Sequence, residues 1–153
     1  MGLIENLRDR VVAFNNGLKS GEFIQNIILE NEPFIVDMNA QDQLFEQGIN
    51  RMGVSIMDYE PYKPGTVEAK IAEGKPYDRV TLRDEGDFES SFYIEADREK
   101  FKIKASDWKA EDLEKKYGQQ IFGLTDENKG VLITEYIYPD LLAMAKNMVY
   151  GKN

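Results

Sequence analysis

The strongest structural signal in the sequence is an alternation of apolar and polar residues that runs from Phe88 to Ala105. Residues 97–99 are all charged and divide the alternating segment into two halves. A period of two is typical of β-strands that bury one face and expose the other. The sequence therefore predicts an antiparallel hairpin, in which glutamates of the first strand lie near lysines of the second. The residues expected on the buried face are Phe88, Ser90, Phe92, Ile94, Ala96, Phe101, Ile103 and Ala105.

Helical periodicity dominates the start of the chain. Apolar residues recur every three or four positions over residues 3–18, which predicts an amphipathic helix. Its end is expected at 15–17 or at 20–21, where glycine follows asparagine or serine. A second, short helix is expected over 22–30.

Pro33 is expected to break the helical pattern, because proline lacks the amide hydrogen that a helix interior requires. Residues 34–38 are then expected to form a short strand or an extended segment. Asn39 is expected to be the N-cap of a helix over 40–49. The remaining segments before the hairpin are predicted as an ordered loop, 52–65, and one or two helical turns, 66–73.

Two more helices are expected after the hairpin. The first covers 110–117 and ends at Gly118, and Thr125 caps a long final helix that reaches about Tyr150. Pro139 should kink or interrupt the final helix. Together these elements predict a single α+β domain over 1–153. It has N-terminal helices, a central antiparallel sheet built on the hairpin, and a long C-terminal helix packed on that sheet.

The sequence contains neither histidine nor cysteine, and its net charge is −9. Thiolate nucleophiles, disulfides, histidine relays and zinc sites built from these residues are therefore excluded. We expect no enzymatic activity and no cofactor. Sequence-specific nucleic-acid binding is not expected, because gripping the phosphate backbone needs clustered Lys and Arg. The apolar runs are too short for a membrane helix, and the first residues do not resemble a signal peptide.

One acidic cluster leaves a metal-dependent alternative open. Asp84, Glu85, Asp87 and Glu89 surround a turn at Gly86, and carboxylates at this spacing can hold Mg²⁺ or Ca²⁺. The cluster lacks the alternating ligands of a calcium loop. Alternation along a strand would also place its last two carboxylates on the solvated face. A solvated turn is the favoured interpretation, and a metal-dependent hydrolase or nuclease is the alternative.

Four aromatic residues outside the predicted elements have two interpretations each. Tyr59, Tyr62 and Tyr77 lie close to prolines, and they are expected to pin an irregular loop to the domain or, less often, to line a ligand groove. Trp108 is the only tryptophan. It either covers one end of the hairpin as core or anchors a protein interface.

The segment 74–92 resembles a known family of phage proteins. Its run Leu-Arg-Asp-Glu-Gly-Asp-Phe-Glu-Ser, at 82–90, is similar to the core of virion-morphogenesis and tail-completion proteins. In that family a helical part precedes the core, while two strands, a Tyr-Gly element, an apolar-Gly-Leu segment and a helix follow it. Lys116–Gly118 and Ile121–Thr125 stand where the last two elements before the helix would be.

The resemblance covers mainly residues 74–130, and it includes two departures. Glu85 stands where the family usually has threonine, and residues 119–122 replace its basic, proline-containing loop. Residues 59–83 also look like proteins from phages and prophages of gut Bacteroidetes.

The resemblance implies a non-enzymatic structural protein that completes the tail or joins head and tail as a ring of identical subunits. Its implied partners are portal, connector or tail-tube proteins, and its place is the virion neck or tail after assembly in the host cytoplasm. Ring contacts need apolar surface that one domain cannot bury, and the wide apolar stripe of the final helix would supply it. An acidic adaptor that mimics nucleic acid is a further alternative. Candidate interface residues are Leu82, Arg83, Asp84, Phe88, Trp108, Phe122, Tyr136 and Leu141.

Overall fold

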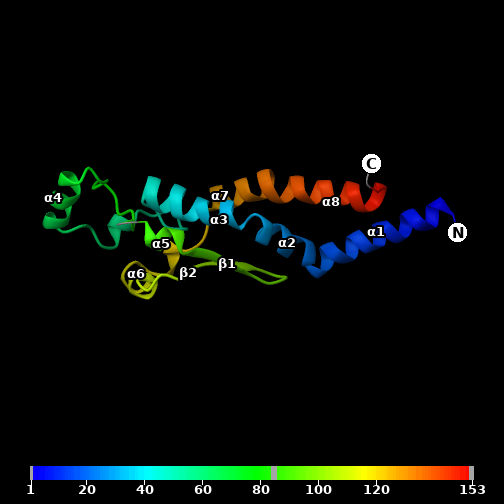
Figure 1. Cartoon of the computed structure of the whole chain (residues 1–153), viewed down its shortest axis with the longest axis horizontal. Helices are drawn as coiled ribbons and strands as arrows, with labels where there is room; N and C mark the ends of the chain where they lie inside the picture. Colours follow the sequence, from blue (N-terminus) through cyan, green and yellow to red (C-terminus); the bar gives the residue numbers. More distant parts are fainter. Residues whose placement is uncertain (1, 84–85, 152–153) are drawn as a thin grey trace.

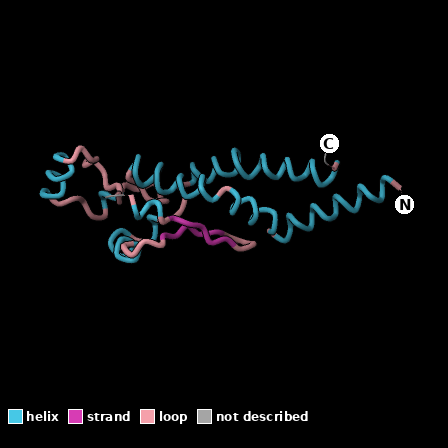
Figure 2. Tube along the Cα trace, in the orientation of Figure 1, coloured by secondary structure: helices cyan, strands magenta, loops and turns pink. Residues whose placement is uncertain are grey.

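The structure is a computed structural model that describes residues 2–83 and 86–151. A two-stranded hairpin lies along one side of a set of helices, and two of these helices extend together beyond the hairpin (Figure 1). The chain is therefore α+β, as the sequence predicts, although helix greatly exceeds strand (Figure 2).

Two helices joined at a glycine begin the chain. Helix α1 (Leu3–Ser20) ends at Gly21, whose φ of 79° is left-handed, and α2 (Glu22–Glu30) follows at once. The earlier of the two predicted helix ends is wrong. Gly17 lies inside α1 because the ring of Phe23 packs against it, and a Cβ at this position would come within 2.2 Å of that ring. The missing side chain thus serves the packing of α2 on α1.

The predicted strand or extended segment at 34–38 is wrong, because this segment is helical. Helix α3 (Glu32–Asp37) runs directly into the π-helix η1 (Met38–Gln47). Pro33 sits in the first turn of α3, where the missing amide hydrogen leaves no helical bond unmade. Asn39 is not an N-cap either. It lies within η1, and its side chain is fully buried.

The segment 49–79 contains little regular structure, as the sequence predicts. Ile49 and Ser55 form an isolated antiparallel bridge, and the 3-10 helix η2 (Ile56–Asp58) follows. Helix α4 (Pro64–Ala72) agrees with the predicted helical turns and buries none of its residues. It projects from the opposite end of the molecule to the two chain termini (Figure 1).

The predicted hairpin is present but shorter than expected. Strands β1 (Phe92–Ala96) and β2 (Phe101–Ala105) pair antiparallel, with Ile94 opposite Ile103. Lys104 Nζ lies 2.8 Å from Glu95 Oε2, which confirms the expected pairing of opposite charges across the strands. Residues 87–90 form the helical turn α5 (Asp87–Ser90) and not the start of the strand. The Ser90 hydroxyl stabilises this turn by donating to the Gly86 carbonyl at 2.9 Å.

The last third of the chain is helical. Helix α6 (Ala110–Tyr117) ends at Gly118, and the 3-10 helix η3 (Gln119–Ile121) follows. Helix α7 (Asp126–Val131) is capped by Thr125, whose hydroxyl accepts the Asn128 amide hydrogen at 3.2 Å. It continues through the π-helix η4 (Leu132–Ile137) into α8 (Tyr138–Tyr150). The interruption expected from Pro139 therefore takes the form of a π-helical segment just before the proline.

The core lies between the hairpin and the helices. Helices α2 and α3 contact β1, α8 packs on α1 and α2, and η4 contributes Leu132 to the core. No helix in the described part of the chain is long and apolar enough to cross a bilayer. The fully buried apolar side chains are Ile27, Ile35, Leu44, Ile56, Val80 and Ile121.

Candidate functional site

Helices α1 and α8 form an arm whose apolar side chains are largely exposed. The two helices run antiparallel and carry both ends of the chain (Figure 1). Gly17 is the one buried residue of α1, and α8 has none. Leu3 and Ile4 are 86% and 82% exposed, and Tyr150 is 77% exposed. An exposed apolar patch of this kind commonly marks an interaction surface.

The arm differs from the rest of the molecule in charge. It carries four basic and three acidic side chains, so it is close to neutral, while the chain as a whole has a net charge of −9. The acidic excess therefore belongs to the rest of the chain, the body, which is everything outside α1 and α8. Both helices also contact α2, but the arm is largely two helices wide, so each helix leaves its outer face without cover.

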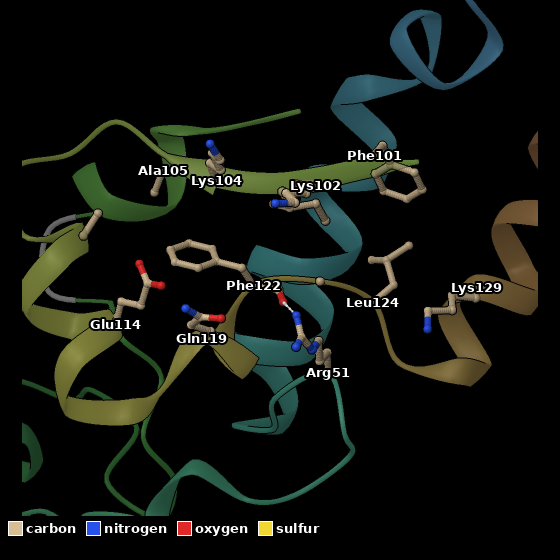
Figure 3. Close-up of a pocket in the computed structure, with 13 residues that line it drawn as sticks. Arg51, Phe101, Lys102, Lys104, Ala105, Glu114, Gln119, Phe122, Leu124 and Lys129 are labelled. Atoms are coloured by element: carbon tan, nitrogen blue, oxygen red, sulfur yellow. Dashed lines mark hydrogen bonds between the residues drawn. The ribbon is translucent and has the colours of Figure 1, made fainter. Parts of the chain in front are cut away.

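A groove of about 680 Å³ lies beside β2 on the body. One wall is the whole of β2, and the facing wall is the segment Phe122–Leu124, whose side chains at 122 and 124 point toward the strand (Figure 3). Four basic residues line the groove against one acidic residue, Glu114. The basic residues are Arg51, Lys102, Lys104 and Lys129.

Arg83 and Glu89 form an ion pair next to a smaller cavity of about 330 Å³. The Arg83 guanidinium also donates to Gln41 Oε1 at 2.7 Å and stacks 3.6 Å from the centre of the Phe45 ring. The side chain of Glu89 is 8% exposed, and its Oε1 has no hydrogen-bond partner among the described residues. Burial raises the pKa of Glu89, although the hydrogen bond and the charge of Arg83 act in the opposite direction.

This arrangement corrects the prediction that Asp87 and Glu89 share a solvated strand face. Asp87 is exposed, but Glu89 turns inward because residues 87–90 are helical. Asp84 and Glu85 lie outside the described residues, so the acidic cluster is not described as a unit. In the ranges 2–83 and 86–151, no group of three acidic side chains is placed to hold a metal ion.

The aromatic residues fall into different environments. The Tyr62 hydroxyl accepts the Thr81 amide hydrogen at 3.2 Å, so this ring pins the loop as expected. Tyr59 and Tyr77 are about half exposed. Trp108 is 79% exposed, which shows that it does not cover the hairpin as core.

The other candidate interface residues do not form one patch with Trp108. Phe88 is buried and packs 6.1 Å from Phe122, between ring centres, so it belongs to the core. Leu82 has a left-handed φ of 58° and is partly buried. Tyr136 lies in η4, and the centre of its ring is 5.2 Å from that of Phe34 in α3. Leu141 is half buried in α8.

Two features were missed at the level of sequence. The sequence predicts α1 as an amphipathic helix, but it does not indicate that the apolar residues Leu3, Ile4 and Leu7 stay exposed. The groove was missed because its walls are far apart in sequence. The alternating lysines of β2 were the available signal, since lysine is common on exposed edge strands.

No protein-family model, curated protein or solved structure matches the chain.

Proposed function

We propose that the protein is a non-enzymatic assembly subunit that packs against further copies of itself through the arm. The observation that carries this proposal is the 18-residue helix α1, in which Gly17 alone is buried. A helix with this much exposed apolar surface gains little stability from its own chain, because most helical stability in proteins comes from tertiary packing. Packing arms against one another would bury that surface.

The charge distribution supports the arm and not the body as the contact between copies. The body carries the acidic excess, and like charges at a contact oppose association. The arm is nearly neutral and apolar, so the contact surface itself adds little repulsion to that between the acidic bodies. Repeating one such contact around an axis produces a closed ring, whereas a two-fold contact produces a dimer.

The head–tail neck of a phage or prophage particle is the setting that we propose for this subunit. Support comes from the resemblance of residues 74–130 to virion-morphogenesis and tail-completion proteins. In this setting the ring completes the tail or joins it to the head, with portal, connector or tail-tube proteins as neighbours. An acidic body would let DNA pass without binding, because like charges repel.

Size-exclusion chromatography with light scattering tests the contact between arms. The chain is expected to form oligomers whose mass rises with concentration. The double substitution Leu3→Gln with Ile4→Gln is expected to shift the equilibrium toward monomer, because both side chains are highly exposed in the single chain. Circular dichroism and the melting temperature of the monomer should change little for the same reason.

Two control variants keep this test specific. Ile71→Gln removes an apolar side chain that is 54% exposed on α4, away from the arm, and should leave the oligomer intact. Trp108→Ala tests the alternative that the exposed tryptophan is the anchor. A chain that stays monomeric at all concentrations, alone and with portal or tail-tube protein, would contradict the proposal.

A further inference from the structure

The two outer edges of the hairpin differ in how their main-chain groups are satisfied. On β1, the Ile94 amide donates to Glu32 Oε2 at 2.9 Å, and the Ala96 carbonyl accepts from Gln25 Nε2 at 3.0 Å. These donors and acceptors come from α2 and α3, which lie against β1. The outer edge of β1 is therefore covered by α2 and α3, and two of its main-chain groups bond to their side chains.

The same bonds establish which residues of β2 face outward. Since the Ile94 amide points away from β2, Ile94 and its partner Ile103 form a pair without mutual hydrogen bonds. Pairs with and without mutual hydrogen bonds alternate along the two strands. The Asp97 amide donates to the Lys100 carbonyl at 2.9 Å, as this alternation requires of the pair at 97 and 100. The residues of β2 whose main-chain amide and carbonyl point away from β1 therefore recur at every second position. They are Phe101, Ile103 and Ala105.

These outward main-chain groups have no protein partner. In the described ranges 2–83 and 86–151, no hydrogen bond joins the amides or carbonyls of Phe101, Ile103 and Ala105 to another group. All three residues line the groove. Ile103 is only 4% exposed, and a buried main-chain group without a partner is unfavourable. An open strand edge of this kind is a template for a further strand.

The side chains around the edge indicate the chemistry of that strand. Lys102 and Lys104 alternate with Phe101 and Ile103 along β2, so the lysines lie on one face of the strand and the apolar residues on the other. Figure 3 shows Phe101, Lys102 and Lys104 beside the groove. Neighbouring strands place paired side chains on the same face. A strand added to β2 would therefore set alternate side chains beside the lysines and beside the apolar residues.

We propose that the groove binds an extended segment of a partner protein, which adds to β2 as a third strand and alternates acidic with apolar residues. A second copy of β2 does not fit this edge, because its lysines would lie against Lys102 and Lys104. The volume of about 680 Å³ lies within the range of ordinary ligand sites. The groove belongs to the body, so this site does not depend on association through the arm.

A nucleic acid would satisfy the cations but not the strand edge. Phosphates interact with lysine and arginine without direction along a strand, whereas Phe101, Ile103 and Ala105 offer alternating amides and carbonyls. The acidic body also repels a polyanion, while a short peptide carries few charges. These points favour a peptide.

Calorimetric titration of the whole chain tests the site. The probe is an acetylated and amidated peptide as long as β2, five residues, in which Val alternates with Glu. It is expected to bind, and Lys102→Glu is expected to weaken binding by roughly tenfold or more, because a close charge pair becomes repulsive. Lys100→Glu changes the same charge in the hairpin turn, outside the groove, and should bind nearly as the unaltered chain does.

Two further measurements separate strand addition from attraction between charges. Successive residues of an extended peptide point their amides to opposite edges. N-methylation of one alternate set should therefore abolish binding, while methylation of the other set leaves it unchanged. Bound peptide should also shift the amide resonances of Phe101, Ile103 and Ala105.

Specific outcomes overturn the proposal. It fails if the peptide does not bind at millimolar concentration, or if the lysine analogue of the peptide binds equally well. It also fails if neither methylated set affects binding. Tight binding of single-stranded oligothymidylate in place of the peptide would assign the groove to nucleic acid. None of these results depends on the oligomeric state, so they leave the proposed assembly role to its own test.

Discussion

At the scale of single residues, two buried amides hold the segment 121–125 against η1. Asn39 donates to the Ile121 carbonyl at 2.9 Å and accepts the Gly123 amide hydrogen at 2.9 Å. Gln43 donates to the Gly123 carbonyl at 2.9 Å and accepts the Thr125 amide hydrogen at 2.8 Å. One wall of the groove is therefore positioned by side chains that are distant in sequence.

Asn39→Ala should lower the free energy of unfolding by about 2–4 kcal/mol. The substitution leaves the Ile121 carbonyl and the Gly123 amide without partners in a buried position. Urea denaturation measures the change, and Asn26→Ala on the exposed side of α2 is the control, with a change within about 0.5 kcal/mol. An equal effect of both substitutions would show that the amide does not position the segment.

The Arg83–Glu89 pair predicts a pH dependence of stability. Burial raises the pKa of Glu89 above its ordinary value of 4.5. The folded chain then binds more protons than the unfolded chain, so this contribution is full below the unfolded pKa and is lost as pH rises through the folded pKa. The stability of the chain relative to Glu89→Gln should therefore fall as pH rises from below 4.5 through the raised pKa of Glu89.

Glu111→Gln provides the opposite case for the same urea titrations. A hydrogen bond from Lys115 lowers the pKa of Glu111, so its contribution is present above the unfolded pKa and lost as pH falls. The stability of the chain relative to this variant should rise with pH. Equal slopes for the two variants would contradict the assignment of a raised pKa to Glu89.

At the scale of elements, Gly21 determines how α1 leaves the body. Its φ is 79°, and a Cβ at this position would come within 2.0 Å of the Arg98 carbonyl oxygen in the hairpin turn. Gly21→Ala should cost about 1–2 kcal/mol for the left-handed backbone and about 1–3 kcal/mol more for the displaced carbonyl. Gly53→Ala is a matched control, since its φ is 74° and nothing lies within 4 Å of the added Cβ. If both substitutions lower the free energy of unfolding equally in urea denaturation, the Arg98 carbonyl moves aside without an energetic penalty.

Much of this level was predictable from the sequence. The hairpin, α2, α6 and the helix that begins at Thr125 follow from periodicity and capping, which act between near neighbours. The errors arise where a packing contact or the start of a helix overrides the local pattern. Gly17 stays helical because Phe23 packs on it, and residues 34–38 are helical because Pro33 falls in a first turn. The groove could not be predicted, because Arg51 and Lys129 reach β2 only through the tertiary fold.

At the scale of the whole molecule, charge separates the two proposed surfaces. The arm is apolar and nearly neutral, while the body holds the acidic excess and, within it, a groove lined by four cations. Association through the arm brings acidic bodies together, so repulsion between them opposes it. Binding of an acidic peptide to the groove instead depends on attraction.

The two surfaces should therefore respond to salt in opposite directions. Raising sodium chloride from about 0.1 M to about 1 M shortens the Debye length from about 10 Å to about 3 Å. Screening of the acidic bodies should increase the oligomer fraction in light scattering, while the same change weakens peptide binding in calorimetry. If high salt dissociates the oligomer into monomers, its contacts are ionic, and the apolar arm does not join the copies. If salt leaves peptide affinity unchanged, Lys102 and Lys104 do not contact the peptide carboxylates.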